Sequence, residues 1–499
     1  MHNSARKVHF LACYYQHMCG IVGVVSRKTP AALDVYECLQ SLQHRGQDAS
    51  GIVTHDRRFF HEKRGEGLVR EVFSADDMMG LKGSAGLGHV RYRTSGSLSL
   101  DAAQPFFVNA PLGIYLVHNG NLTNTAELTA VVSQKSRYLR SNSDSEILLN
   151  VFADALASAI RSSPISPQSI FKAVGAMMDQ LRGAYACILL IDKVGLLAFR
   201  DPHGIRPLMI GSRGKGRQRD FAFASEDAAF SAASFKAIRD VGAGEAVLID
   251  MSGKMHAFQV RKGELSPCIF EYIYLARPDS AMNGVSVYKT HLRLGRLLGR
   301  QIRKAKVALD VVIPIPDSAR PEALEIAHKL GIPHREGLVK NRYIGRTFIM
   351  PDQKTRAASV RRKLSVIPLE FKGKRVLLVD DSIVRGTTIR QIIAMCREAG
   401  AKKVYVASAA PPVRFQNVYG VDIPTRHELV AHGKSIEKVR RAIGADGLFY
   451  QTVPDMIEAA RVGNRRITRF EDSVFTGDYV TGDVTPVYLR RLEKNNHHG

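Results

Sequence analysis

Short apolar runs alternate with longer segments of helical periodicity in the first half of the chain. Runs of strand length, bounded by turn residues, predict strands at residues 21–25, 86–92, 114–118, 184–191 and 196–200. Apolar positions at helical spacing predict helices at residues 31–43, 145–162 and 167–180. Strands flanked by helices in this way are typical of an α+β layered sandwich.

From about residue 285 the pattern changes to a regular alternation of helices and strands. It predicts helices at residues 292–305 and 321–330 and from Thr387 onward, and strands at residues 311–315, 375–379 and 403–407. Such alternation predicts a parallel, doubly wound sheet of the α/β class. We expect the boundary between the two halves between residues 250 and 285.

Composition sets the size and the class of the protein. The chain has 499 residues, 45% of them hydrophobic, which leaves room for two or three domains with ample core. No segment approaches the ~18 unbroken apolar residues of a membrane helix, so we expect no membrane partner. The six cysteines include no CxxC pair, which favours reduced thiols in a cytoplasmic protein over a disulfide framework.

The net charge is the unusual feature of the composition. Lys and Arg number 71 against 47 for Asp and Glu, which gives +24. Such a surplus of positive charge can keep the protein surface soluble, bind a phosphate-rich small ligand or bind nucleic acid. The basic residues are dispersed, and no helix-turn-helix or zinc-finger spacing is present. Solubility is therefore the favoured explanation, a phosphate-rich ligand comes second, and we expect no nucleic-acid partner.

The most informative segment of the second half is residues 376–388, Val-Leu-Leu-Val-Asp-Asp-Ser-Ile-Val-Arg-Gly-Thr-Thr. A buried strand delivers Asp380 and Asp381 to its carboxyl end, where open α/β sheets bind ligands. The loop N–H groups and the start of the next helix favour a phosphate, and Gly386 permits close backbone approach. The two carboxylates can hold ribose hydroxyls or a hydrated Mg²⁺.

This string resembles the phosphoribosylpyrophosphate-binding motif of type I phosphoribosyltransferases. The resemblance assigns to that site the residues Asp380, Asp381, Ser382, Ile383, Val384, Arg385, Gly386, Thr387 and Thr388. It also places Ser318, at the end of the strand in residues 313–318, beside the metal and the pyrophosphate. Ala319 stands where family members often carry glycine, which weakens the assignment of Ser318.

A basic segment at residues 340–364 looks like the loop of these enzymes that closes over the sugar diphosphate. Closure would exclude water and bring cations to the leaving pyrophosphate. The candidate cations are Lys340, Arg346 and Lys363. A solvated surface loop is the alternative interpretation of the same composition.

The first half carries its chemistry around Cys19, which precedes an apolar strand. Alone, it could be an ordinary exposed cysteine, but four further segments accompany it, at residues 42–51, 88–96, 118–122 and 143–146. Together they resemble the class II glutamine amidotransferases, whose fold is an N-terminal nucleophile (Ntn) sandwich and whose N-terminal cysteine attacks glutamine. The thiolate is the nucleophile, and an α-amino group with a pKa of ~7.7–8.0 is suited to be its general base.

The resemblance implies a role for each matching residue. Asn119 and Gly120 would donate to the oxyanion, while Arg91 would bind the α-carboxylate of glutamine and Asp144 its α-ammonium group. Other positions that would line the glutamine pocket are Arg45, Gly46 and Thr94. The family usually has proline where this chain has Arg93, so we expect a changed turn there with catalysis intact.

The mechanism requires a free amine on Cys19, because an amide nitrogen cannot accept the proton. Losing a general base costs about 10²–10⁴-fold. We therefore expect residues 1–18 to be a leader or propeptide and the mature chain to start at Cys19. Initiation at Met18 with removal of the methionine would produce that end, and proteolysis or an overlong start are the alternatives. A weak targeting peptide is a further one.

Two further strings, at residues 199–208 and 268–280, complete a resemblance to the amidophosphoribosyltransferase family over residues 18–490. It implies a glutamine amidotransferase domain at 19–265, a type I phosphoribosyltransferase domain at 266–470 and a C-terminal extension at 471–499. The implied reaction transfers ammonia from glutamine to 5-phosphoribosyl-1-pyrophosphate and opens de novo purine synthesis. A dry passage for ammonia between the two sites would form when the 340–364 loop closes.

The resemblance also bears on cofactors and partners. Mg²⁺ is the expected cofactor. Some members hold an iron–sulfur cluster, and Cys268 matches one ligand position, but no cysteine follows Cys396, so we expect no cluster. Purine nucleotides are the expected feedback inhibitors, and a homo-oligomer, tetramer or dimer, is the expected assembly.

Three other functions compete with this one. A glutamine:fructose-6-phosphate amidotransferase shares the first half but lacks the string at residues 376–388. A phosphoribosyltransferase with a silent glutaminase half would follow if Cys19 were never exposed. A basic regulatory protein that only retains the fold would leave the matching catalytic residues without a purpose.

Overall fold

The computed structural model describes residues 18–27, 30–92, 103–134, 137–161, 163–216, 219–341, 361, 363–423 and 425–497. Two of the sequence-predicted site residues, Thr94 and Arg346, lie outside these ranges, as do residues 1–17 and most of the 340–364 segment. Among the described helices, none is both long enough and apolar enough to cross a membrane.

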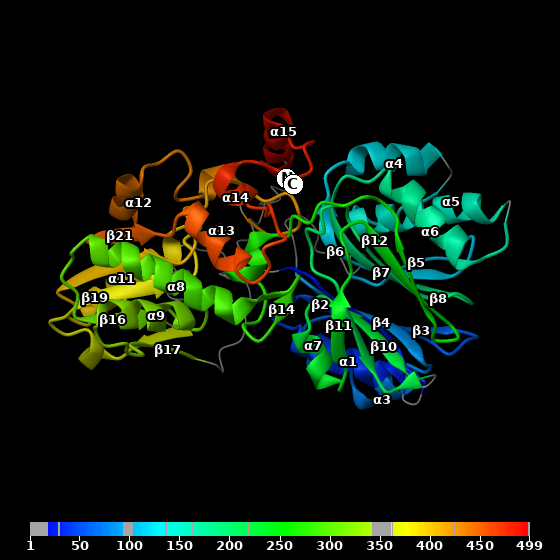
Figure 1. Cartoon of the computed structure of the whole chain (residues 1–499), viewed down its shortest axis with the longest axis horizontal. Coiled ribbons are helices and arrows are strands. Elements are labelled where there is room, and N and C mark those ends of the chain that lie inside the picture. Colours follow the sequence, from blue (N-terminus) through cyan, green and yellow to red (C-terminus); the bar gives the residue numbers. More distant parts are fainter. Residues whose placement is uncertain are drawn as a thin grey trace, which may run out of the picture.

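Two antiparallel sheets face each other in the first half (Figure 1). Within the described residues, one sheet has seven strands in the order β11-β9-β10-β1-β4-β2-β3. Their bounds are β1 Gly20–Val25, β2 Ala49–His55, β3 Phe60–Glu66, β4 Ala85–Arg91, β9 Met209–Arg213, β10 Asp220–Ala224 and β11 Lys236–Asp240. The other has six strands in the order β13-β12-β8-β7-β6-β5. Their bounds are β5 Phe106–Val108, β6 Ile114–Leu122, β7 Gly183–Ile191, β8 Gly195–Arg200, β12 Glu245–Asp250 and β13 Met255–Gln259.

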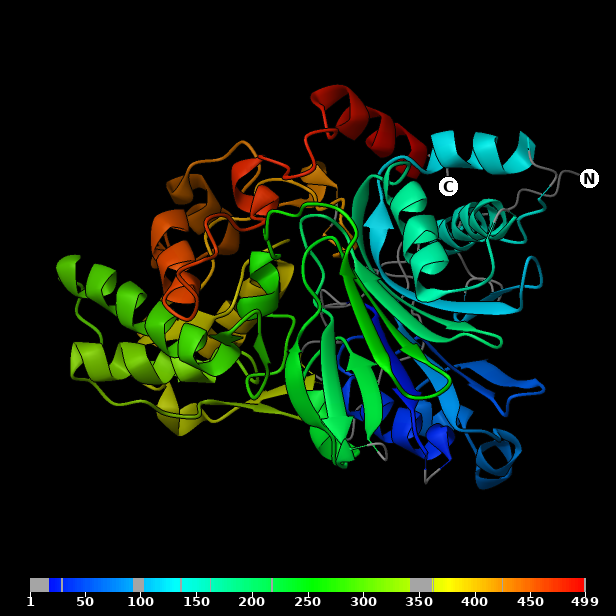
Figure 2. The ribbon, with the colours of Figure 1, turned by 45° about the vertical axis from the view of Figure 1, so that its right-hand side comes forward.

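Apolar side chains from both sheets fill the space between them, because alternate residues of a strand point to opposite faces. Ile21 and Leu87 of the first sheet pack there with Val117 and Ile188 of the second. Helices cover the two outer faces, with α5 and α6 over the second sheet and α1 over the first (Figure 2). The helices of this half are α1 Ala31–Ser41, α2 Val69–Val72, α3 Ala75–Gly80, α4 Thr125–Gln134, α5 Asp144–Ile160, α6 Pro167–Met178 and α7 Ala228–Ala232. This arrangement confirms the predicted α+β sandwich.

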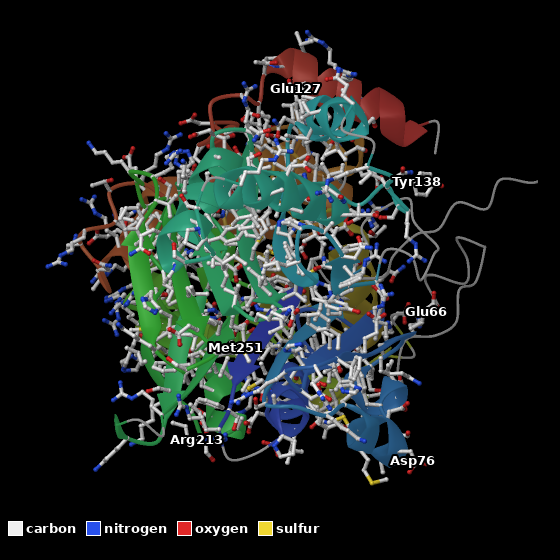
Figure 3. The ribbon with its side chains drawn as sticks, turned by 90° about the vertical axis from the view of Figure 1, so that its right-hand side faces the viewer. Glu66, Asp76, Glu127, Tyr138, Arg213 and Met251 are labelled. Atoms are coloured by element: carbon white, nitrogen blue, oxygen red, sulfur yellow. The ribbon has the colours of Figure 1, made fainter. Side chains whose placement is uncertain are left out.

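The layers are easiest to follow from the side of the first half. Glu127 of α4 and Asp76 of α3 mark opposite ends of that view, with the two sheets between them (Figure 3). The last helix, α15 Pro486–His497, crosses beside α4 at the Glu127 end. A hydrogen bond from Thr123 Oγ1 to Asp483 Oδ2, 2.5 Å long, joins the same two regions.

A parallel sheet organises the second half, as predicted. Within the described residues it has four strands in the order β16-β19-β20-β21, with bounds β16 Val311–Pro314, β19 Arg375–Asp380, β20 Lys403–Ser408 and β21 Gly447–Tyr450. Helices α8 Val287–Lys304 and α9 Arg320–Leu330 cover one face, and α11 Thr387–Glu398 and α12 Ile436–Ile443 cover the other. Residues such as Leu377 and Val379 therefore face α8 and α9, whereas Leu378 faces α11.

The remaining elements are short or lie where the two halves meet. They are η3 Ile269–Tyr272, β14 Ala281–Met282, β15 Val285–Ser286, β17 Leu338–Lys340, β18 Leu364–Val366, η4 Pro368–Glu370, η5 Arg426–Glu428, α13 Val453–Arg461 and α14 Ser473–Thr476. One apolar core runs through the junction and contains Met18 and Val22 as well as Tyr419 and Phe470. The domain limits at residues 265 and 470 stay predictions.

Most predicted elements are confirmed, and the differences have local causes. Helix α8 begins at Val287, five residues before its predicted start, because the Ser286 hydroxyl accepts a hydrogen bond from Lys289 N and caps it. Strand β6 runs on to Leu122 because its ladder with β7 continues to the Leu122–Gly183 pair. The residues of β3 are mostly half-buried and those of β13 mostly exposed, so both strands carry little apolar signal and lie outside the predicted set.

Candidate active sites

Cys19 lies directly before β1 and is half-buried. Burial raises the pKa of its thiol. The Tyr92 backbone and the charges of Arg91 and Arg45 pull that pKa down, and Asp144 pushes it up. Arg91, at the end of β4, and Asp144, at the start of α5, therefore both lie near enough to the sulfur for their charges to act on it.

Asn119 and Gly120 lie on β6, which pairs with β7 behind the cysteine. The Asn119 side chain is buried, and its Nδ2 has no hydrogen-bond partner among the described residues. A buried donor without a partner is costly unless a ligand uses it. Gly120 has φ of 148°, and a Cβ there would meet Ala184 O at 2.0 Å, so no side chain fits.

Asp144 is held at the first turn of α5. Its Oδ2 accepts a hydrogen bond from Leu122 N at 3.0 Å, and its Oδ1 accepts one from Ser145 Oγ at 3.3 Å. The same Ser145 hydroxyl lies 2.9 Å from His118 Nδ1. The carboxylate is thereby tied to the strand that carries Asn119 and Gly120. Gly46 packs against the end of β4, where a Cβ would meet the Val90 and Arg91 carbonyl carbons at 2.6 Å.

Arg45, which the resemblance assigns to the lining of the glutamine pocket, is held in buried ion pairs. Its guanidinium is buried between two carboxylates, with Nε on Glu226 and Nη2 2.6 Å from Glu271 Oε2. These partners hold the pKa of Arg45 above its usual value in spite of its burial. A direct contact of Arg45 with glutamine stays a prediction, since in this structure the guanidinium is committed to the ion pairs.

A tight turn from the second half presses against this site. Asn417 Oδ1 accepts hydrogen bonds from Tyr419 N at 2.8 Å and Val421 N at 3.0 Å, which closes the turn. Gly420, with φ of 97°, lies against Gly120, and a Cβ on it would meet Gly120 O at 2.7 Å.

Two side chains of the first half donate to carbonyls of the same turn. Asn121 Nδ2 lies 2.9 Å from Val418 O, and Arg206 Nε lies 2.9 Å from Tyr419 O. The strand that carries Asn119 and Gly120 is therefore braced from across the domain boundary.

The second candidate site lies at the carboxyl end of the parallel sheet. Asp380 ends β19, and Asp381 follows it, buried. Both oxygens of Asp381 accept hydroxyl hydrogen bonds, one from Ser318 and one from Ser382 Oγ at 2.7 Å. Burial raises the pKa of Asp381 to about 6, and burial together with the charge of Asp381 raises that of Asp380. The structure thus brings Ser318 and the two carboxylates together.

The loop after Asp381 ends at the amino terminus of α11. Gly386 takes the left-handed conformation, with φ of 74°, and is the residue before the helix. The next two residues, Thr387 and Thr388, present at least part of their side chains to solvent, whereas Ile383 is buried in the core below. Val384 O accepts a hydrogen bond from Val430 N at 2.9 Å. Ile383, through its burial, and Val384, through this hydrogen bond, therefore anchor the loop.

The cations predicted around this site are partly described. Lys340 Nζ lies 3.2 Å from Asp317 Oδ2, one residue from Ser318. Lys363 is half-buried and directly precedes β18, and its carbonyl accepts a hydrogen bond from Asn341 N, just after β17, at 2.8 Å. Arg385 pairs with Glu428 at 2.9 Å.

Comparison with known proteins decides the family. A glutamine amidotransferase domain matches residues 89–232 and a phosphoribosyl transferase domain matches residues 287–413. The amidophosphoribosyltransferase of Pseudomonas aeruginosa is 52% identical over 482 residues, with 96% of each chain covered. That of Escherichia coli is 51% identical over 482 residues, with 95% of each chain covered. The glutamine phosphoribosylpyrophosphate amidotransferase of B. subtilis, solved in complex with ADP and GMP, has a TM-score of 0.82 at 35% identity and covers 94% of this chain and 98% of its own.

The chain belongs to the amidophosphoribosyltransferase family. It therefore transfers the amide nitrogen of glutamine to 5-phosphoribosyl-1-pyrophosphate, which yields 5-phosphoribosylamine, glutamate and pyrophosphate in the first step of de novo purine synthesis. The α+β sandwich is its glutaminase half, and the parallel α/β sheet is its phosphoribosyltransferase half.

The cysteine matching a cluster ligand in some amidophosphoribosyltransferases, Cys268, is buried at the junction of the halves. Its backbone pairs with that of Glu471 in an isolated parallel β-bridge. Burial raises the pKa of the Cys268 thiol to about 12. No group of three or more His, Cys, Asp and Glu with the geometry of a metal site occurs among the described residues.

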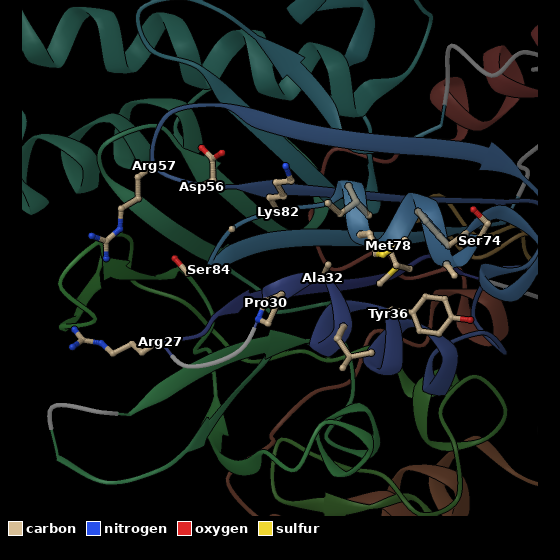
Figure 4. A pocket seen from close by; sticks show the side chains of 16 residues that line it. Arg27, Pro30, Ala32, Tyr36, Asp56, Arg57, Ser74, Met78, Lys82 and Ser84 are labelled. Carbon is tan, nitrogen blue, oxygen red and sulfur yellow. The ribbon is translucent and has the colours of Figure 1, made fainter.

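A groove of about 870 Å³ lies on the outer side of the glutaminase half, between α1, α3 and the turn after β2. Tyr36 and Met78 line one end, and Arg27 and Arg57 line the other (Figure 4). It shares no residue with either candidate site of this amidophosphoribosyltransferase.

Sequence reasoning missed the residues that support the two sites. Arg206 and Glu271 lie within the strings at residues 199–208 and 268–280 without a signal of their own, yet both belong to the buried ion pairs around Arg45. His291 and Glu322, a buried pair below Asp381, gave no signal beyond one histidine in an amphipathic helix. The Asn417 turn has an ordinary loop composition, and only its contacts reveal it.

Proposed function

We propose that the glutaminase chemistry is carried by Cys19 as nucleophile, with Asn119 and Gly120 as oxyanion donors. The observation that supports this assignment most directly is the buried Nδ2 of Asn119, beside Gly120 on a strand tied to Asp144, which finds no hydrogen-bond partner in the described part of the chain. Arg91 binds the α-carboxylate of glutamine and Asp144 its α-ammonium group. The opposite charges of these two side chains both act on the Cys19 thiol, which supports one shared pocket.

The proposed reaction begins when the free α-amine of Cys19 takes the thiol proton. The sulfur then bonds to the amide carbon, and the amide oxygen becomes an oxyanion that accepts from Asn119 Nδ2 and Gly120 N. Collapse of this intermediate breaks the C–N bond, and the protonated amine of Cys19 returns its proton to the leaving nitrogen, so that ammonia departs. Water then hydrolyses the glutamyl thioester to glutamate and restores the thiol.

This sequence requires a chain that starts at Cys19, and we propose that residues 1–18 are removed. Met18 is buried, and its Sδ lies 2.6 Å from Arg206 Nη1. While Met18 remains attached, the Cys19 nitrogen is an amide and cannot serve as the base.

We propose that the sugar diphosphate binds at the carboxyl end of the parallel sheet. The backbone of residues 382–386 and the start of α11 would bind the 5-phosphate through N–H groups, with Arg385, Thr387 and Thr388 as further donors. The carboxylates of Asp380 and Asp381 would hold the ribose hydroxyls. Lys340 and Lys363 would face the pyrophosphate.

Mg²⁺ is the proposed cofactor of this half. It commonly takes one or two carboxylates, with substrate phosphates and water as its other ligands. Asp380 and Asp381, with the hydroxyl of Ser318 beside them, fit that donor set. Bound there, the cation would neutralise charge on the pyrophosphate as it leaves. Ammonia attacks C1 of the ribose, the bond from C1 to the pyrophosphate oxygen breaks, and the new ammonium group loses a proton to give 5-phosphoribosylamine.

The two sites work as a pair if ammonia passes between them without meeting bulk water, where most of it would be protonated. The contact of the Asn417 turn with Gly120 supports a passage at this junction. We further propose inhibition by purine nucleotides, supported by the B. subtilis relative solved with ADP and GMP, a homo-oligomeric assembly, and a cytoplasmic location.

The deciding experiment is intact mass and N-terminal sequencing of the protein from its native host, paired with pyrophosphate release from glutamine or from ammonium chloride. A chain that starts at Cys19 and uses glutamine supports both half-reactions. A chain that starts at Met1 and works only with ammonium chloride would mean a silent glutaminase half.

A further inference from the structure

Two ionisable side chains lie buried on the inner side of the proposed sugar-diphosphate site. His291 is in α8, Glu322 is in the first turn of α9, and their Nδ1 and Oε1 atoms are 2.8 Å apart. Their side chains are only 4% and 0% exposed. Burying two charges is costly, and such a pair is weak evidence for stability alone. The position of the His291–Glu322 pair beside the proposed site therefore says more about its role than its contribution to stability does.

The pair exists because α8 and α9 touch at a glycine. A Cβ on Gly295 would meet Glu322 O at 2.5 Å and Glu322 Cα at 2.7 Å, so any other residue would push the helices apart. Glu322 reaches His291 across this contact. Burial disfavours charge on His291, but Glu322 overrides it and holds the pKa of His291 above its usual value.

The pair is linked to the substrate loop in two ways. Helix α9 begins two residues after Ser318, whose hydroxyl donates to Asp381. Glu322 also raises the pKa of both Asp380 and Asp381, whereas His291 lowers that of Asp381. Without the His291 cation, the buried charge of Glu322 would add to those of Asp380 and Asp381 below a substrate that is itself strongly anionic, and like charges at this range repel.

We propose that His291 is a positioning residue of the phosphoribosyltransferase half: it neutralises Glu322, so that the loop from Asp380 to Ser382 admits an anionic sugar diphosphate. The inference rests on the proposed binding site and adds a group that does not touch the substrate. Net charge at the pair, more than its packing, sets the affinity of that site.

The test compares neutral variants that keep the shape of the pair. In a chain that starts at Cys19, His291→Gln, Glu322→Gln and the double variant are assayed for ammonia-dependent pyrophosphate release at saturating MgCl₂. His291→Gln leaves Glu322 unbalanced and raises KM for phosphoribosylpyrophosphate about tenfold, with kcat within about twofold. Glu322→Gln leaves KM at or below that of the parent, and the double variant returns it to within about threefold of the parent.

An exposed ion pair between the same two helices supplies the control. Arg296 Nε lies 3.3 Å from Glu325 Oε2, and the Arg296 side chain is 53% exposed. Arg296→Gln should leave KM unchanged. Thermal unfolding of every variant separates loss of fold from loss of affinity.

The outcomes are distinguishable. If the pair is merely structural, both single variants would show a lower midpoint of thermal unfolding and a lower kcat, and KM would not depend on which charge was removed. That result would overturn the proposal. If His291→Gln does not fold, Glu322→Gln carries the test, and a raised KM in that variant overturns it. Asp381→Asn is assayed in parallel. An unchanged KM there would reject the sugar-diphosphate site itself, whereas an effect at Asp381 without one at His291 rejects only the positioning role.

Discussion

The two candidate sites are built in opposite ways. The sugar-diphosphate site is mostly one continuous stretch, in which β19, the loop from Asp381 to Gly386 and the start of α11 follow one another, with Ser318 added from the next strand. The glutaminase site gathers Cys19, Arg91, Asn119 and Asp144 from separate strands and a helix. It is also braced by the Asn417 turn from the other half.

The difference shows where each site is vulnerable. A loop with its own hydrogen bonds keeps its geometry as long as the sheet beneath it folds. A site assembled from distant segments depends on packing that lies far from the chemistry, and displacements of about 1 Å can cost about 10²-fold in rate. Each of the following experiments tests one side of this contrast.

The largest effect is expected at the nucleophile. Cys19→Ser removes the thiolate and should lower glutamine-dependent synthesis on the order of 10⁴-fold or more. Synthesis from ammonium chloride should stay within about twofold of the parent, because the other half is untouched. Parallel assays with the two nitrogen donors make the comparison, and an equal loss with both would contradict separate sites.

Asp381→Asn should produce the reciprocal pattern with a smaller magnitude. The amide replaces a carboxylate that accepts from Ser318 and Ser382, so synthesis from either nitrogen donor should fall about 10²–10³-fold. Glutamine hydrolysis measured without the sugar diphosphate should change little. If glutamine hydrolysis alone were lost, Asp381 would belong to the glutaminase site, and the assignment to the sugar-diphosphate site would be contradicted.

Gly420→Ala tests the brace across the domain boundary. The new methyl group would meet Gly120 O at 2.7 Å, so the oxyanion strand must shift. We expect glutamine-dependent kcat to fall about 10–100-fold while ammonia-dependent synthesis is kept.

Gly433→Ala is the control, because Gly433 also has a positive φ, of 64°, but a Cβ there would meet no atom of the described residues within 4 Å. Both substitutions place a side chain on a backbone with positive φ, and only the first collides with the glutaminase half. If Gly420→Ala and Gly433→Ala lowered kcat equally, the contact between Gly420 and Gly120 would not explain the loss.

The smallest effect concerns pH. Burial raises the pKa of Asp381 to about 6, so its carboxylate takes up a proton in mildly acidic solution, and protons then compete with Mg²⁺. The half-saturating Mg²⁺ concentration in ammonia-dependent synthesis should be level above about pH 7 and rise up to about tenfold per pH unit below about pH 6. Magnesium titrations between pH 5 and 8, chosen as a range around that pKa, provide the measurement. A flat dependence would show that Asp381 does not take part in binding the cation.

Much of the fold and the sugar-diphosphate site could be predicted from the chain alone, for a physical reason. Strand β19 and helix α11 are strongly periodic, and their connecting loop contains the residues that a phosphate cradle requires. Strands β3 and β13 could not be found in this way, because their apolar pattern is weak and pairing with a neighbouring strand forms them.

The sequence by itself determined the chemistry that is available: a cysteine before a buried strand, two carboxylates at the end of another, and a glycine before a helix. Tertiary structure alone decided which distant groups meet. It placed Arg45 between Glu226 and Glu271, His291 against Glu322, and the Asn417 turn against Gly120. Local propensity acts between neighbours in the chain, whereas these contacts join residues far apart in it, and only the packing of complete elements brings them together.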